Sequence, residues 1–496
     1  MPLNVFGAGN ISAEGADFIR IDNVQNRTDR TQKLANIVVT GPLLDGWAGS
    51  IDAALGITWR SDEGSFAADE ALFTGDALGF GGESSIDGSE EVWELYGETV
   101  VPLAENTAWA DYLGLEIGAR YSSYENAGEH WTYKLGGEWQ PVDGLRLRSM
   151  YQRSVRAPNI AELFEEQFTS SAFPFGSMPD PCSASSDPVA NGNQEKCIIQ
   201  GLQSTQIGVF EANTLLPSDY VRGGNPNLDP EEANTYTVGA VLDLDALPNW
   251  TIAIDYFDLE VTDTIGTIDA LAICFDPLNT SSLFCDNISR SASGEVSQIV
   301  ELTSNRGLLR TKGIDTQLAY TTDLPAALAI GDSIANLKLN AVWTHTLTID
   351  MQENPTTQIL ECAGRFGSPC FDGSVFVTGQ TFARNRFTAF ANYDSGPLTL
   401  HLTWRWIDGT DNAAPLDVRF SGSPDSLAIP NVDSESYVDL GVGYRFSDRF
   451  VTRLNINNLF DTDPPQMADA VAGINTDSGM YDVFGRSYVV SFSAGF

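Results

Sequence analysis

Hydrophobic and polar residues alternate strictly along many segments of about ten residues in this chain. In one such segment the large apolar side chains share one side: Leu398, Leu400, Leu402, Trp404 and Trp406. The side chains between them are polar: Thr399, His401, Thr403 and Arg405. Successive side chains of a strand point to opposite faces, so strict alternation predicts a β-strand with one apolar and one polar face.

The end of the chain follows the same rule. Tyr488, Val490, Phe492, Ala494 and Phe496 fall on one side of the pattern, opposite small polar residues with Val489 as the exception. In water, an edge strand that ends in an aromatic residue is an aggregation hazard. A strand that closes a membrane barrel, with Phe496 in the interfacial aromatic girdle, has no such problem. The ending therefore indicates a bacterial outer membrane.

Turn signals divide the alternating segments into about fifteen strands. We expect these near 32–44, 49–60, 91–101, 111–124, 130–140, 145–156, 233–245, 250–262, 303–322, 335–348, 382–394, 398–408, 436–446, 450–458 and 485–496. Tight turns such as 141–144 and 395–397 alternate with long polar stretches such as 157–232 and 263–300. Short turns on one rim and long loops on the other are typical of antiparallel transmembrane β-barrels, so the predicted fold class is all-β of that type.

Composition excludes several other classes of protein. No run of about 18 apolar residues is present, which excludes a helical membrane protein. The formal net charge of −40 argues against nucleic-acid binding. Only three histidines occur, none beside a plausible nucleophile, so we expect no enzymatic activity, no cofactor and no resident metal. The acidic segment Asp408–Asn412 could hold Ca²⁺, although it lacks the full spacing of a calcium loop.

The six cysteines form three close pairs in loop-like segments: Cys182 and Cys197, Cys274 and Cys285, and Cys362 and Cys370. Local pairs in irregular segments suit disulfides formed in an oxidising compartment. Free thiols are the alternative. Metal binding is less favoured, because no histidine lies near a pair.

Four segments carry distinctive motifs: 154–164, which contains Arg156, Pro158 and Asn159; 224–239, with Asn225 and Pro226; 457–465, with Asn458 and Phe460; and 481–496, with Gly485, Arg486, Tyr488 and Phe496. In their sequence, order and spacing the four resemble the barrel of TonB-dependent receptors, the ligand-gated importers of the outer membrane. The first three groups of residues are expected to fix turns and a helix start rather than bind ligand, with Pro158 in the first turn of a short helix through Phe168.

The resemblance implies import of a scarce ligand of the siderophore, cobalamin, oligosaccharide or peptide class, driven by the TonB complex through a plug domain. It also implies that Tyr488 and Phe496 serve the barrel assembly machinery, and that the wall contacts outer-membrane lipid. The sequence does not identify the ligand-binding residues. The ligand implied by the resemblance is either a small molecule or an oligomer.

The chain also departs from the family. We see no signal peptide, TonB box or plug in it, and the family barrel has about 22 strands. We therefore expect residues 32–496 to form the C-terminal portion of an incomplete barrel, and residues 1–31 the remainder of an extracellular loop. The first and last strands should run in the same direction, which forbids their antiparallel closure. A passive porin and a non-transport surface barrel such as an adhesin remain the alternative functions.

Overall fold

The computed structural model describes residues 11–21, 23–74, 76–77, 84–175, 179–243, 247–276, 279–370, 381–416, 427–467 and 475–495. The terminal Phe496 lies outside these residues. Within them, no helix is both long and apolar enough to cross a bilayer.

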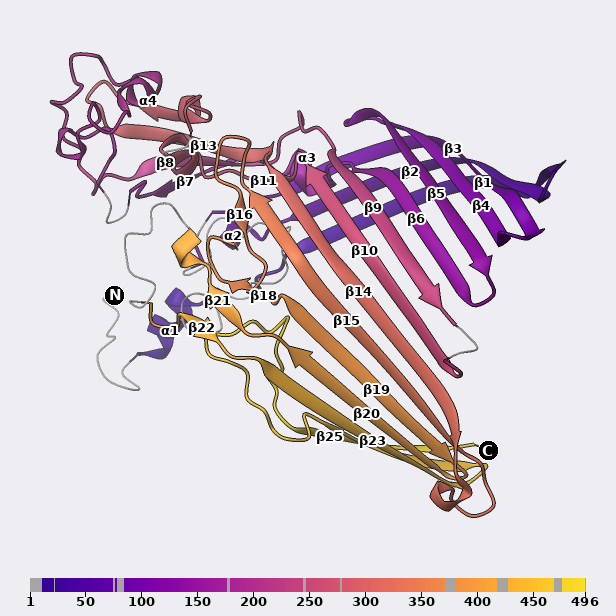
Figure 1. Cartoon of the computed structure of the whole chain (residues 1–496). Helices are drawn as coiled ribbons and strands as arrows, with labels where there is room; N and C mark the ends of the chain where they lie inside the picture. The colour runs from indigo at the N-terminus through magenta and orange to yellow at the C-terminus, as the bar shows by residue number, and fades with distance from the viewer. Residues whose placement is uncertain are drawn as a thin grey trace.

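A single antiparallel sheet of fifteen consecutive strands dominates the described chain and forms a curved wall (Figure 1). Each strand pairs with the next wall strand along the chain. Their bounds are β1 Arg27–Gly46, β2 Gly49–Ala67, β3 Ile86–Thr107, β4 Ala110–Tyr124, β5 Gly128–Val142, β6 Leu145–Arg156, β9 Glu231–Leu242, β10 Trp250–Thr262, β14 Leu308–Leu324, β15 Ala335–Gln352, β19 Asn385–Ser395, β20 Leu398–Ile407, β23 Glu435–Ser447, β24 Phe450–Asn457 and β25 Ser487–Ala494. The two-residue strand β16 (Leu360–Glu361) adds to β15.

The fifteen predicted strands are confirmed, with corrections at their ends. β1 begins at Arg27 rather than near 32 and is paired with β2 along its whole length. The predicted strand 303–322 is two elements, because residues up to Asn305 belong to β13 in a separate sheet and the wall strand begins at Leu308. Periodicity could not place this break, since both pieces alternate.

The two rims of the wall differ as the turn signals predict. Gly46 and Gly49 pair across the first turn, and Ser395 and Leu398 pair across another. The opposite rim carries the long connections, except that Tyr124 and Gly128 pair across a short one. We call these the short-turn rim and the loop rim.

Both edge strands run toward the short-turn rim. β1 ends at the turn that leads to β2, and β25 enters from the loop rim after the connection that follows β24. Among the described residues no pairing joins β1 to β25, so the wall has two edges. This agrees with the prediction that the first and last strands run in the same direction.

Two small sheets fold from the long connections. The first has the order β11 (Ile265–Thr267), β13 (Val296–Asn305), β8 (Ser218–Gly223) and β7 (Phe168–Ala172), with β12 (Ile288–Arg290) on β13. It projects beyond the wall strands, at the upper left of Figure 1. The second has the order β18 (Thr381–Phe382), β17 (Arg365–Phe366), β21 (Thr410–Asn412) and β22 (Asn431–Val432). We call them the first and second loop sheets.

The helices are all short: α1 Ala13–Ile19, α2 Glu70–Phe73, α3 Ile160–Phe164, α4 Gln194–Ile199 and α5 Ala270–Cys274, with 3₁₀ turns at Ala184–Ser186, Cys285–Asn287, Ala326–Leu328 and Ala414–Leu416. The buried apolar clusters of the described chain gather around the loop sheets, whereas many large apolar side chains of the wall are exposed. This inversion fits a wall whose apolar face meets lipid rather than a protein core.

Candidate functional site

The loop rim brings together most of the residues that the sequence singled out. At the end of β6, the guanidinium of Arg156 donates to Glu231 at 2.7 Å and to Glu162 at 3.0 Å. Glu231 is nearly buried and also accepts the backbone N–H of Ile265 at 2.8 Å. Arg156 therefore ties β6, β9 and the connection after β10 together, which is a structural role.

The helix after β6 is shorter than the sequence suggested. Asn159 caps it in a capping box with Glu162, so the helix begins at Ile160 and Pro158 precedes the cap instead of lying in the first turn. The helix ends at Phe164 rather than Phe168, because Glu165 leaves the helical conformation, with φ −54° and ψ 126°, and forms a bridge to Ile86. The prediction through Phe168 was wrong because a cross-loop backbone pairing leaves no local signal.

Asn225 and Pro226 lie in the turn that returns to the wall. The Asn225 N–H donates to the carbonyl of Glu162 at 2.8 Å, and its side-chain amide donates to the carbonyl of Thr303 at 3.0 Å. Its side-chain oxygen accepts the N–H of Asn227 at 2.9 Å. These bonds connect α3, this turn and β13, as the turn chemistry of the pair leads one to expect.

A buried ion pair joins the two connections that build the first loop sheet. Arg290 donates to the two carboxylate oxygens of Asp180 at 2.7 and 2.9 Å, and both side chains are almost fully buried. Its Nε also donates to Gln200 at 2.8 Å. Neighbouring alternation patterns could not reveal this contact, because Arg290 and Asp180 lie in different connections.

Three disulfides form with the pairing that the sequence predicts. Cys182–Cys197 and Cys274–Cys285 lie beside the first loop sheet, and Cys362–Cys370 lies beside the second. The amide of Gln200 donates to the sulfur of Cys274 at 3.3 Å and so links the first two bridges. All six sulfurs belong to buried residues. The disulfides therefore limit the freedom of these connections in the unfolded chain.

Burial shifts the pKa of several titratable groups in and beside the first loop sheet. It raises the pKa of Glu301, although Arg222 donates to this carboxylate at 2.8 Å. It raises the pKa of Tyr220 to about 12 and lowers the pKa of Lys196. Each shift favours the neutral form, as expected when a charge leaves water.

The motif residues before the last strand shape two turns of the connection that leads to it. Asn458 has a positive φ of 50°, and its side-chain oxygen accepts the N–H of Thr462 at 2.9 Å. Gly485 has φ 68°, and the Arg486 N–H donates to Asp461 at 2.8 Å. Both turns need the left-handed region that glycine and asparagine tolerate. Phe460 in contrast is 67% exposed.

The acidic segment weighed as a calcium loop is engaged within the protein. Asp408 accepts from the Asn385 amide at 2.6 Å, and Asp411 lies 3.5 Å from Arg365. The Asn412 side chain accepts the N–H of Ala414 and donates to Ile429. Over the described residues, no group of three or more potential metal ligands converges.

Charged pairs cross the strands on the polar face of the wall. Lys134 lies 2.5 Å from Glu116 and 2.9 Å from Glu98. Further pairs lie on the same face: Arg120 with Glu94, Arg148 with Asp255, and Arg405 with Asp439. The alternation placed these charges on one face but could not pair them across strands. The face is a polar surface suited to binding and passage of a hydrophilic solute, with no arrangement of a nucleophile and a base among these pairs.

A long antiparallel sheet with one polar and one apolar face, short turns on one rim and disulfide-tied loops on the other defines the wall of an outer-membrane β-barrel. The family model described as "TonB dependent receptor-like, beta-barrel" matches residues 4–459. The chain therefore belongs to the TonB-dependent receptor β-barrel family. Members of this family lie in the bacterial outer membrane and are transport proteins rather than enzymes.

Solved receptors share the fold at low sequence identity. The ferric enterobactin receptor PfeA of Pseudomonas aeruginosa, in a variant form, matches with TM-score 0.59 and 17% identity over 95% of this chain and 54% of that chain. The siderophore receptor PirA of Acinetobacter baumannii matches with TM-score 0.56 and 17% identity over 96% and 56%. The ferric-catecholate import receptor Fiu of E. coli K12 matches with TM-score 0.52 and 12% identity over 95% and 55%.

The chain thus spans little more than half the length of these solved receptors. A search of curated proteins gave no match.

Proposed function

We propose that this wall is part of a receptor that imports a scarce ligand across the outer membrane with energy transmitted by TonB. The observation that carries the proposal is the family match over residues 4–459. The ligand is of the siderophore, cobalamin, oligosaccharide or peptide class. The solved relatives are siderophore or ferric-enterobactin receptors, and at 17% identity they support the fold rather than one ligand.

The loop rim and the adjoining polar face are the proposed docking region. The first loop sheet is built from two connections that a buried ion pair joins, and a disulfide within each connection closes that connection on itself. A rigid loop structure loses less conformational entropy when a ligand binds, which favours affinity. The cross-strand charges below it offer partners to a polar ligand that enters the lumen.

We further propose that the wall from Arg27 onward is the C-terminal portion of the receptor barrel and that the residues before it are the remainder of an extracellular loop, which moves the boundary expected between residues 31 and 32 to the start of β1. The plug domain and the TonB contact would then be supplied from outside these residues. The parallel direction of β1 and β25 supports this arrangement, since an antiparallel barrel closes only with strands of opposite direction. The C-terminal strand, with Tyr488 exposed on its apolar side, is the proposed contact of the assembly machinery.

Uptake measurements in the native bacterium test the import proposal. Deletion of the gene that encodes this chain should abolish uptake of one scarce ligand, and deletion of TonB should abolish the same uptake. Diffusion of a small neutral sugar through other pores serves as the control and should stay unchanged. Uptake that depends on this gene but survives loss of TonB would instead support a passive channel. Loss of surface adhesion without any loss of uptake would support an adhesin.

A further inference from the structure

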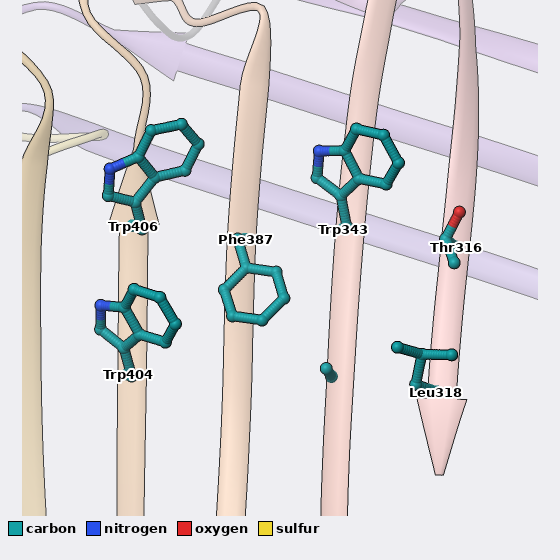
Figure 2. Close-up of a pocket in the computed structure, with 7 residues that line it drawn as sticks. Thr316, Leu318, Trp343, Phe387, Trp404 and Trp406 are labelled. Atoms are coloured by element: carbon teal, nitrogen blue, oxygen red, sulfur yellow. The ribbon is translucent and has the colours of Figure 1, made fainter. Parts of the chain in front are cut away.

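The polar face of β14 and β15 can be identified from an apolar groove on their other side. Figure 2 shows Thr316 and Leu318 of β14 and Trp343 of β15 along this groove, on the apolar face of the wall. Successive side chains of a strand point to opposite faces, so Asp315 and Thr344 lie on the polar face. The hydroxyl of Thr344 donates to Asp315 at 2.7 Å, which agrees with this placement.

Two glycines let the neighbouring side chains of β10 lie against the wall. An added Cβ at Gly313 would lie 2.5 Å from Cζ of Phe257, because the phenyl ring leans across β14 onto this glycine. An added Cβ at Gly239 would overlap the carboxylate of Asp255, which leans the other way across β9. The two side chains therefore diverge. The ring of Phe257, which is half-buried, rests on the wall with one side and leaves the other to the lumen.

The row beside this ring places hydrogen-bond acceptors and donors across six neighbouring strands. In register, the row consists of Arg148, Gly239, Asp255, Asp315, Thr344 and Arg386. Asp255 accepts from Arg148 at 2.8 and 2.7 Å, so these two groups satisfy each other. Within the described part of the chain, Asp315 accepts only from Thr344 and Arg386 forms no ion pair. This carboxylate and this guanidinium therefore keep free acceptor and donor atoms.

The loop rim, through which a ligand would arrive, disfavours anions. Among the residues that the structure describes, each arginine or lysine of the loop-rim connections is already engaged: Arg222 with Glu301, Arg290 with Asp180, Arg306 with Glu353, Arg365 with Asp411, Arg384 with Glu361, Arg486 with Asp461, and Lys196 with the carbonyl of Asp276. The whole chain has a formal net charge of −40. A field of this sign repels anions, so the rim favours a neutral or cationic ligand.

We propose that this part of the polar face binds a neutral oligosaccharide, and we call its four binding residues the lumenal strip: Phe257, Asp315, Thr344 and Arg386. A sugar hydroxyl both donates and accepts, so it can pair with the free carboxylate and the free guanidinium. The apolar C–H face of a sugar ring packs on the exposed side of Phe257. One free group of each sign favours a neutral ligand over a cation.

The length of the row favours an oligosaccharide over a single sugar. Six strands at the usual spacing extend about 24 Å, so the row can contact several units of one chain. The inference rests on the proposed import function and selects one of its ligand classes.

Binding to the purified full chain tests the lumenal strip without any need for transport. Isothermal titration uses maltohexaose, cellohexaose, xylohexaose and chitohexaose as neutral probes, and hexagalacturonate as an anionic probe of the same length. Phe257→Leu and Asp315→Ala each remove one binding group. Tyr112→Leu and Asp52→Ala are the matched controls, on the polar faces of β4 and β2, and Tyr112 also lies over a glycine, Gly114. Circular dichroism of each variant verifies that the strand content is retained.

We expect at least one neutral hexasaccharide to bind the wild-type chain and both controls with equal affinity. The Kd should rise about tenfold in each strip variant, as expected when a hydrogen bond to a charged group or a ring contact is lost. Binding of hexagalacturonate alone would overturn the choice of a neutral ligand. Absence of binding by every probe, or equal binding by wild type and strip variants, would overturn the strip.

Uptake of the bound sugar separates this inference from the proposed function. Sugar binding that depends on the strip, without TonB-dependent uptake of the same sugar by the native bacterium, would contradict the import function and support the strip. TonB-dependent uptake of another ligand, without sugar binding, would contradict the strip alone.

Discussion

Loss of one partner from a buried ion pair costs a protein more stability than loss of one partner from an exposed pair. The ion pair between Arg290 and Asp180 lies almost wholly out of water, whereas Asp411, which pairs with Arg365, is 63% exposed. Removing one partner of a buried pair leaves an uncompensated charge, but an exposed partner is readily replaced by water. Removal of one partner should therefore cost far more stability in the buried pair than in the exposed pair.

Asp180→Ala should destabilise the first loop sheet by about 3 kcal/mol or more, because Arg290 remains buried without its counter-charge. Hydrogen exchange of the amides in β8 and β13 measures this change as faster opening. Asp411→Ala is the matched control and should leave those amides unaffected. Unchanged exchange in Asp180→Ala would show that water enters and solvates the guanidinium.

Glu301 should make the first loop sheet sensitive to pH. Its folded pKa is raised above the ordinary value of 4.5, so protonation favours the folded state. The stabilisation is fully present below pH 4.5 and is lost as pH rises through the raised folded pKa. Hydrogen exchange of β8 and β13, corrected for intrinsic rates, should show greater protection as pH falls through this window.

The lowered pKa of Glu211 acts in the opposite direction, so a variant must isolate the effect of Glu301. Glu301→Gln should remove the difference between neutral and acid pH that belongs to this group. The same pH profile in wild type and variant would mean that Glu301 does not titrate with folding.

At the scale of elements, the connections behave as small folded units attached to a wall. Each loop sheet has its own buried cluster and at least one disulfide. Sequence separations of 15 and 11 residues mean that Cys182–Cys197 and Cys274–Cys285 close short loops. Such bridges mainly limit the freedom of the unfolded connections.

Replacing Cys182 and Cys197 together by serine should cost the first loop sheet about 3 kcal/mol on the chain-entropy model. Exchange and proteolysis near 180–212 should increase, while the wall strands keep their protection. The same double change at Cys362 and Cys370 is the control, since it should affect the second loop sheet only. Peptide mapping without reduction should recover all three links, and free thiols at any pair would contradict this assignment.

At the scale of the whole molecule, the main feature is that the wall has two edges whose outward backbone groups are not paired with each other. β1 is exposed along nearly its whole length, and among the described residues it pairs only with β2. In lipid, each unpaired backbone group costs several kcal/mol, so edges of this length require partners. Further strands of the same receptor are the proposed partners.

Backbone exchange tests this arrangement. In the chain alone, the amides of β1 and β25 that point away from the sheet should exchange quickly, whereas those of β14 and β15 should be protected on both sides. Supplying the remaining receptor segment should slow exchange in β1 and β25 and leave β14 unchanged. Slow exchange of both edges in the chain alone would indicate closure by another route, such as a second copy.

The sequence by itself determined the wall, and the tertiary structure decided the loops. Alternation with period two is a local property, so it fixed fifteen strands, their apolar faces such as Trp404 and Trp406, and the order of short turns and long connections. The disulfides were also predictable, because each joins two cysteines that lie close together in one connection. The contacts of Arg290 with Asp180, and of β13 with β8, join residues from different connections. The end of α3 depends on the bridge between Glu165 and Ile86, and the separation of β13 from β14 depends on the pairing of β13 with β8. These contacts lie outside the local pattern, so the predicted bounds were wrong. The apolar groove on the wall, whose lining includes Ala341, Trp343 and Phe387, arises only when the register sets β15 and β19 side by side. No local pattern contains that information, because register is decided by pairing between strands.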